Sequence, residues 1–198
     1  MHILVLGATG RTGKRIAQNL VSAGHTVTSA GRRDPQITGV TFRKVDLADT
    51  NALRDIAGES DGVVSALASG KGNPVCSNVA RAVSGMNGLR FITIGGAGVD
   101  VAGDQKALPD RIVGWIMRRV VPAMLADRQA ELAVLQNSRV RWTMLRPPRL
   151  TDKAASGTVR ITFDTPASSA ISRADLARGA VDALGDDALI GRAPFVAA

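Results

Sequence analysis

A glycine-rich turn directly after a short apolar run is the feature that most constrains the fold of this chain. Residues 3–6 form the apolar run, and the sequence GATGRTG at residues 7–13 follows it and opens a segment of helical periodicity. Gly7 permits a tight reversal, Gly10 lets a pyrophosphate approach the backbone, and Gly13 lets the helix pack close to the strand. The helix N-terminus offers free N–H groups and a partial positive charge to phosphates. The turn predicts a dinucleotide-binding βαβ unit, with a plain strand-to-helix turn as the alternative.

Apolar runs alternate with segments of helical periodicity along the rest of the chain. Strands are expected over residues 3–6, 26–29, 40–45, 62–66, 90–94 and 142–145, and shorter ones over 159–163 and 193–197. Helices are expected over residues 12–23, 50–57, 74–86 and 110–135, the last interrupted at Pro122, and after residue 172. Thr50 and Ser172 are expected to cap their helices. This alternation predicts an α/β chain with a Rossmann-type doubly wound parallel sheet, in a single domain spanning residues 1–198.

The charge balance narrows the classes of partner. The chain carries 25 Lys and Arg against 17 Asp and Glu, a formal net charge of +8. This excess favours an anionic partner such as a phosphorylated cofactor, with a merely basic surface as the alternative. The basic residues are scattered rather than gathered in a run, which argues against nucleic-acid binding. Cys76 is the only cysteine, so no intramolecular disulfide can form.

The apolar segments of the sequence bear on localisation. We find neither a signal peptide nor an apolar run long enough to span a membrane, so a cytoplasmic protein without a membrane partner is expected, as a monomer or a homodimer. Residues 110–125 form an apolar segment edged by arginines. We expect a helix packed on the sheet there. A wall of a substrate pocket, a dimer face and a membrane-surface helix are the alternatives.

The tip of the second expected strand bears on which dinucleotide binds. An NAD site usually has an acidic residue about 20 residues beyond the glycine turn, where it binds a ribose hydroxyl. Here the strand ends with Arg32 and Arg33, and Asp34 follows one residue too late, before Pro35. Two guanidinium groups suit a 2′-phosphate, because it accepts charge-assisted, bidentate hydrogen bonds. NADP(H) is therefore the predicted cofactor, unless both arginines only face solvent.

Four segments together carry a resemblance to a known family. They are GATGRTG at residues 7–13, Asp46-Leu47, LRPPRLTD at residues 145–152 and ISRADLA at residues 171–177. In this order they resemble the atypical short-chain dehydrogenase/reductases, with the nearest likeness to the NAD(P)H-binding, NmrA-like proteins and the flavin reductase/biliverdin-IXβ reductase group. The resemblance spans nearly the whole chain.

The resemblance implies a role for individual residues. The pyrophosphate and the nearby ribose would be held by Gly7, Thr9, Gly10, Arg11 and Thr12, and Gly13 completes the turn. Arg32 and Arg33 would hold the 2′-phosphate, while Asp46 and Leu47 would meet the adenine. The adenosine ribose would be lined by Ala66 and Leu67. The nicotinamide would be bordered by Gly95 and Gly96 and by Arg146, Pro147 and Pro148.

The sequence also departs from the family. Short-chain dehydrogenases that act on alcohols use a Tyr and a Lys, and this chain has no tyrosine. Related proteins often carry Ser or Thr after the fifth strand, where this chain has Gly95 and Gly96, and Thr93 falls within the strand itself. Lys71, Asp100 and Asp104 lie in the loops nearest the expected acceptor, with a solvated position as the alternative for each. Interconversion of alcohol and ketone is therefore not expected, and no catalytic residue or metal ligand is assigned.

Hydride transfer to a flavin or quinone needs no protein acid of matched pKa, because the acceptor can take its proton from water. The sequence therefore favours an NADPH-dependent oxidoreductase that reduces a flavin, quinone or similar planar small molecule. A non-catalytic NADP(H)-binding redox sensor is the alternative, favoured by the missing acid. A binder of an acidic partner, driven by net charge, is the third hypothesis.

Overall fold

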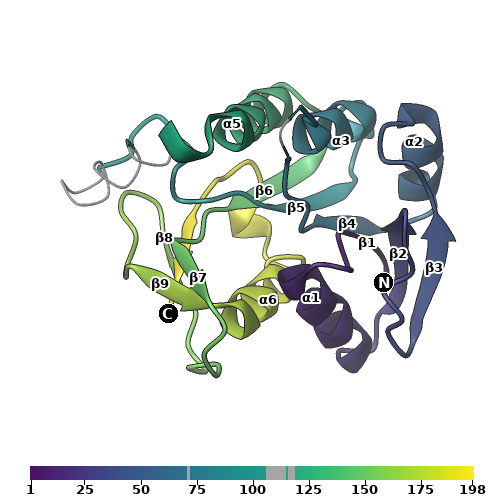
Figure 1. The fold of residues 1–198 in the computed structure, drawn as a ribbon, viewed down its shortest axis with the longest axis horizontal. Coiled ribbons are helices and arrows are strands. Elements are labelled where there is room, and N and C mark those ends of the chain that lie inside the picture. The colour runs from purple at the N-terminus through teal and green to yellow at the C-terminus, as the bar shows by residue number, and fades with distance from the viewer. Residues whose placement is uncertain (71, 106–114, 116–118) are drawn as a thin grey trace.

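The computed structural model describes residues 1–70, 72–105, 115 and 119–198. A parallel sheet lies at its centre, with six strands in the order β3-β2-β1-β4-β5-β6 (Figure 1). The strands are β1 (His2–Leu6), β2 (Thr26–Gly31), β3 (Val40–Lys44), β4 (Gly62–Ser65), β5 (Arg90–Ile94) and β6 (Arg141–Leu145). The order reverses direction between β1 and β4, and ligands of open α/β sheets bind at the carboxyl ends of such strands.

Helices cover both faces of this sheet, as Figure 1 shows. The helices are α1 (Arg11–Ser22), α2 (Thr50–Gly58), α3 (Val75–Val83), α5 (Pro122–Gln136) and α6 (Arg173–Asp182). On one face α1 packs against α6, and on the other α3 packs against both α2 and α5. The predicted α/β class, with a doubly wound parallel sheet, is confirmed.

The alternation of side chains along the central strands divides the apolar core in two. Val5 and Val64 pack on the α1 and α6 side, whereas Leu6 and Val63 pack on the α2, α3 and α5 side. Both faces of these strands are buried, which is why they form continuous apolar runs rather than alternating patterns. The carboxyl edge of the sheet is thus held rigidly from both sides.

The C-terminal third adds two small sheets that the sequence predicted only in part. A parallel pair joins β7 (Arg149–Thr151) to β9 (Ala170–Ser172), and an antiparallel pair joins β8 (Arg160–Thr162) to β10 (Phe195–Ala197). The expected strands over 159–163 and 193–197 correspond to β8 and β10. Neither β7 and β9 nor the short 3₁₀ helix η1 (Asp187–Leu189) was expected, because these three-residue elements do not belong to a longer apolar or alternating segment, as β8 and β10 do.

The two predicted helix caps had different outcomes. Ser172 caps α6, since its side chain accepts a hydrogen bond from the Asp175 N–H at 2.9 Å. The expectation for Thr50 was wrong, because the Asp49 carboxylate caps α2 by accepting from Asn51 and Ala52 N–H, both at 3.0 Å. A carboxylate is as good a cap as a hydroxyl, and Thr50 is the first helical residue.

Part of the expected structure lies outside the described residues. Lys71 does, as does half of the apolar segment expected over residues 110–125. From Pro122 onward the chain forms α5, and the proline occupies the first helical position, where its missing N–H leaves no bond unmade. Within the described ranges, no helix is long and apolar enough to cross a membrane.

Candidate functional site

The turn between β1 and α1 is built as the glycine pattern predicts. Gly7 has φ +86°, a conformation that favours glycine, and its carbonyl accepts the Gly10 N–H at 2.9 Å. A Cβ on Gly13 would lie 2.1 Å from the Gly7 oxygen, and a Cβ on Gly7 would lie 2.9 Å from the Ala66 backbone. A Cβ on Gly10 would meet only the Gly7 oxygen, at 3.2 Å. Gly7 and Gly13 therefore serve packing, whereas the outer side of Gly10 is open.

The start of α1 is suited to an anion. Gly10 is the residue before its first turn and offers no side-chain cap, and the first turn carries no acidic residue. The unbonded N–H groups of this helix end and its partial positive charge are therefore left for a phosphate. Arg11 begins the helix, and its guanidinium forms an exposed ion pair with Asp152 at 2.8 Å. This contact brings the segment after β7 beside the glycine turn.

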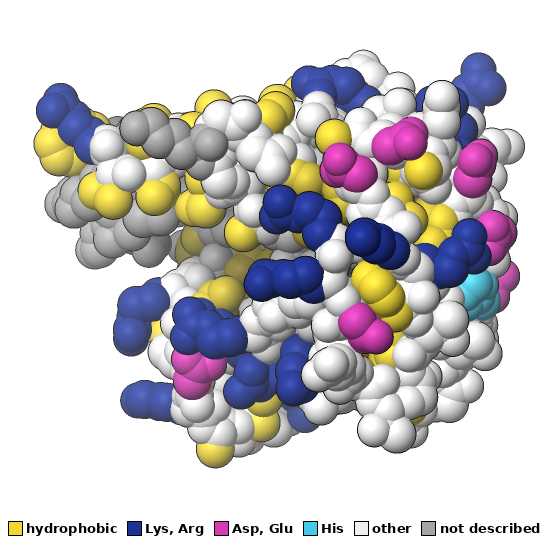
Figure 2. All heavy atoms as spheres, turned by 45° about the vertical axis from the view of Figure 1, so that its right-hand side comes forward, with side chains coloured by type: hydrophobic (Ala, Val, Ile, Leu, Met, Phe, Trp, Pro, Cys, Tyr) yellow, Lys and Arg dark blue, Asp and Glu magenta, His cyan; other side chains and the backbone are white. Residues whose placement is uncertain are grey.

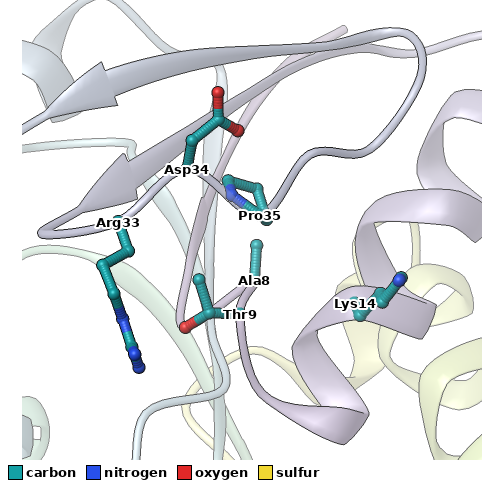
Figure 3. A pocket seen from close by; sticks show the side chains of 6 residues that line it. All are labelled: Ala8, Thr9, Lys14, Arg33, Asp34 and Pro35. Carbon is teal, nitrogen blue, oxygen red and sulfur yellow. The ribbon is translucent and has the colours of Figure 1, made fainter.

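A shallow cavity of about 320 Å³ adjoins the turn, between α1 and the segment after β2. Its lining residues are Ala8, Thr9, Lys14, Arg33, Asp34 and Pro35. In Figure 3 the Arg33 side chain extends alongside Thr9, whereas the Asp34 carboxylate points to the opposite side. Asp34 accepts the Gln36 N–H at 2.8 Å, so it stabilises its own turn. The sequence did not point to Lys14, whose spacing on the helix is typical of a solvated residue.

The residues expected at the adenine and ribose lie along the same edge of the sheet. Asp46 follows β3, and its carboxylate accepts the Ala48 N–H at 3.0 Å. Leu47 is half-buried against the core on the α2 and α3 side. Ala66 follows β4 and donates its N–H to the Leu6 carbonyl at 2.9 Å. The backbone of Ala66 and Leu67 therefore forms one wall beside the glycine turn.

The loops after β5 and β6 meet at the other end of this edge. The Gly95 N–H donates to the Leu145 carbonyl at 2.8 Å, and the Ala97 N–H donates to the Pro147 carbonyl at 2.9 Å. These bonds bring together the two segments expected at the nicotinamide. A Cβ on Gly95 would lie 2.9 Å from the Met144 side chain, whereas Gly96 faces open space. Gly96, rather than Gly95, therefore has room beside it.

Arg146 is turned into the protein. Its side chain is fully buried and forms a bidentate ion pair with Asp104, at 2.7 and 2.8 Å. Its Nε donates to the Ala193 carbonyl at 2.6 Å, and its guanidinium stacks 3.9 Å from the Phe195 ring centre. The guanidinium therefore anchors the loop after β5 to β10, and these contacts leave it unavailable to a cofactor. Asp104, a candidate ionisable group near the acceptor, is part of this anchor.

The sequence analysis did not identify a buried cluster of charged residues on α5. Asp127, Arg128 and Glu131 lie on one side of α5 and are 5%, 6% and 0% exposed. Arg128 pairs with Glu131 at 2.6 Å, and the Thr93 hydroxyl donates to Glu131 at 2.8 Å. Charged residues at helical spacing normally indicate a solvated face, so no pattern separated these three from exposed ones.

Asp127 links this cluster to α3. Its carboxylate accepts the N–H groups of Cys76 and Ser77, both at 3.0 Å, and the hydroxyl of Ser69. Burial alone would raise the pKa of Asp127, but these hydrogen bonds hold it below its usual value. Burial raises the pKa of the Cys76 thiol to about 12, which leaves it neutral and unreactive. The first turn of α3 is thus closed by protein groups.

Comparison with known proteins agrees with this geometry. Residues 7–187 match the family described as NAD(P)H-binding. The chain belongs to this NAD(P)H-binding family. No curated protein matches the sequence. The predicted membership of an NAD(P)H-binding family is therefore confirmed.

Solved structures share the fold of this NAD(P)H-binding chain. The anaerobilin reductase ChuY of Escherichia coli superposes with a TM-score of 0.82 at 17% identity, covering 100% of this chain and 97% of that one. A proposed NADH-flavin reductase of Streptococcus pneumoniae gives 0.82 at 22%, covering 100% and 99%. A short-chain dehydrogenase/reductase of Veillonella parvula, in complex with NADP, gives 0.79 at 19%, covering 100% and 94%.

The carboxyl edge of the sheet differs in character from one end to the other. Arg33 and Lys14 make the end near β2 basic, which suits a phosphate. At the other end Thr93 is fully buried, with its hydroxyl bonded to Glu131 on the α5 side. Among the described residues, no group of His, Cys, Asp and Glu is arranged to hold a metal ion. The arrangement can therefore hold and orient a dinucleotide, and Thr93 is not placed to serve as its acid.

Proposed function

We propose that the protein is an NADPH-dependent reductase that transfers a hydride to a flavin, a quinone or a similarly planar acceptor. The observation that carries the proposal is the glycine turn with its adjoining cavity, which Thr9, Lys14 and Arg33 help to line. Gly10 leaves the approach of a pyrophosphate open, and the uncapped start of α1 faces it. The family match and the reductases among the structural neighbours support the same reaction class.

In this proposal each part of the cofactor is bound by a different group of residues. Gly7 to Gly13 bind the pyrophosphate, Arg32, Arg33 and Lys14 bind the 2′-phosphate, and Asp46, Leu47, Ala66 and Leu67 border the adenosine. The loops at Gly95 and Pro147 flank the nicotinamide. When bound, NADPH supplies the hydride. The acceptor takes its proton from water, because the chain has no tyrosine and the Thr93 hydroxyl is engaged with Glu131.

The test is a titration of the protein with NADPH and NADH by fluorescence, followed by FMN and a quinone in the same cuvette. We expect tight NADPH binding and rapid oxidation once an acceptor is added. Absence of binding by either nucleotide would overturn the proposal. The variant Arg33→Gln should weaken NADPH and spare NADH, whereas Arg139→Gln, an exposed arginine at the amino edge of the sheet, should change neither.

An NADP(H) sensor without turnover is the second candidate. The specific observation in its favour is the loop after β5, where Gly95 and Gly96 offer no hydroxyl and Thr93 is turned away. Tight NADPH binding with no oxidation by flavins or quinones would support the sensor. Rapid oxidation would exclude it.

A further inference from the structure

Arg128 and Glu131 form an ion pair inside the protein, on the α5 face of the sheet. The guanidinium and the carboxylate lie 2.6 Å apart, and both side chains are more than nine-tenths buried. Removing two charges from water costs several kcal/mol each, and their attraction often only offsets that cost. A well-packed apolar pair would serve stability equally well. The pair therefore calls for a reason other than stability.

The contacts of the Arg128 guanidinium supply that reason. Nη1 donates to Glu131 and to the Thr93 hydroxyl, the latter at 3.2 Å, and Nη2 donates to the Leu67 carbonyl. Leu67 belongs to the loop after β4, and Thr93 is two residues before the Gly95 loop. A single planar group thus joins the loop after β4 to the end of β5, from which the Gly95 loop departs. A lysine side chain carries a single ammonium group on a flexible chain, and it lacks the planar, two-pronged arrangement of donors that the guanidinium has.

The loop after β4 also touches the glycine turn. The Gly7 backbone packs so closely on Ala66 and Leu67 that a Cβ there would come within 2.9 to 3.1 Å of them. Any shift of the Leu67 carbonyl therefore reaches the pyrophosphate turn. The guanidinium keeps its charge throughout. Burial alone would lower the pKa of Arg128, but the Glu131 carboxylate raises it above its usual value.

We propose that Arg128 is a positioning residue, which fixes the loops after β4 and β5 through Leu67 and Thr93 and thereby aligns the nicotinamide half of the cofactor. This inference rests on the proposed NADPH site. Within the adenosine half, the 2′-phosphate and the adenine lie at the β2 end, at Arg33 and Asp46, and none of the described contacts of Arg128 reaches those two residues. Among its described contacts, the Leu67 carbonyl is the point at which Arg128 reaches the wall beside the adenosine ribose. The two halves of the cofactor should therefore respond differently to changes at Arg128.

The experiment compares NADPH with 2′,5′-ADP, which carries only the adenosine half. The variant Arg128→Gln/Glu131→Gln removes both buried charges together. The variant Arg128→Lys keeps the positive charge but loses the planar pair of Nη donors. We expect the double variant to bind NADPH about tenfold more weakly and to transfer hydride up to about a hundredfold more slowly, as misalignment by an ångström does. Binding of 2′,5′-ADP should change less than about twofold, and Arg128→Lys should fall between.

Arg90 provides the matched control. It is also a buried arginine, at the amino end of β5, and donates to the carbonyls of Arg141, Ala183 and Leu184. Arg90→Lys should lower the melting temperature and leave the ratio of NADPH to 2′,5′-ADP affinity unchanged. If Arg128→Lys and the double variant weaken both ligands in parallel, or weaken neither, the positioning role is wrong. If the wild type binds NADPH but reduces no acceptor, the proposed reaction fails while the binding comparison still decides the role of Arg128.

Discussion

Three glycines in the turn after β1 look alike in sequence, yet they answer to different constraints. A Cβ on Gly13 would lie 2.1 Å from the Gly7 oxygen, closer than any side chain tolerates, whereas a Cβ on Gly10 would lie 3.2 Å from the same oxygen, a tight contact that a shift of a few tenths of an ångström relieves. The absence of a side chain on Gly10 leaves the outer side of the turn open to a pyrophosphate. Stability and cofactor binding can therefore be separated within one turn.

We predict that Gly10→Ala folds with nearly wild-type stability but binds NADPH at least about tenfold more weakly, because its methyl group stands where the pyrophosphate approaches. Gly13→Ala should lose about 3 kcal/mol or more of unfolding free energy, as overpacking at a rigid backbone contact does. Urea unfolding and NADPH titration of both variants check this. Equal loss of stability in the two would contradict the separation.

Two buried hydroxyls on neighbouring strands provide a second contrast. Ser65 and Thr93 are register partners on β4 and β5. Thr93 donates to Glu131, whereas the Ser65 Oγ is the buried side-chain oxygen or nitrogen without a partner in the described part of the chain. We predict that Thr93→Val costs about 1–3 kcal/mol of unfolding free energy, because Glu131 loses a donor. Ser65→Ala should stay within about 0.5 kcal/mol of wild type in the same urea titration.

At the scale of elements, the start of α6 ties the C-terminal third together. The Asp175 carboxylate accepts the N–H groups of Ser156 and Gly157, at 2.8 and 3.2 Å, and the Ser172 hydroxyl at 2.8 Å. Burial alone would raise the pKa of Asp175, but these bonds lower it below its usual value. The ionised form is thus favoured in the folded protein.

The pH dependence of stability follows from this shift. A carboxyl whose folded pKa lies below its unfolded value of about 3.9 adds stability above that pH and loses it as the pH falls further. Asp175→Asn should cost about 1–3 kcal/mol at pH 7, with a deficit that narrows below a pH of about 4. Chemical unfolding of both proteins at pH 7 and pH 3.5 measures this. A deficit that is constant with pH would show that ionisation of Asp175 is not involved.

The same scale shows where sequence reasoning succeeds and where it stops. The strands β1, β4 and β5 were predictable because they are buried on both faces, and the edge strand β3 was predictable from its place in the alternation of strands and helices. The glycine turn was predictable because its backbone admits little else. Arg128, Glu131 and Arg146 were not predictable in their true roles. Burial of a charge depends on partners far along the chain, such as Asp104 for Arg146, and local periodicity carries no trace of such partners.

At the scale of the whole molecule, positive charge dominates one surface. Figure 2 shows Lys and Arg side chains gathered in the centre and at the lower left of this face, with most of the acidic ones towards the right. Together with the net charge of +8, this field attracts anions over several ångströms and weakens as salt is added. The attraction between the protein and an anionic cofactor should therefore grow with the negative charge of the cofactor.

We predict that salt weakens NADPH binding more steeply than NADH binding, because the 2′-phosphate adds up to about two negative charges beside Arg33 and Lys14. Dissociation constants measured across a series of NaCl concentrations test this. In Arg33→Gln the two salt dependences should converge. Parallel slopes for the two nucleotides in the wild-type protein would place the 2′-phosphate away from these residues.

The buried pair of Arg128 and Glu131 also limits how this chain can change. Losing either partner alone strands an uncompensated charge in the core, at a cost of about 3–5 kcal/mol, whereas exchanging both for apolar residues is close to neutral. A series of single substitutions that removes the pair must therefore pass through a destabilised intermediate. A library that varies one position at a time will retain both charges, and only a library that varies the two positions together can reach the uncharged alternative.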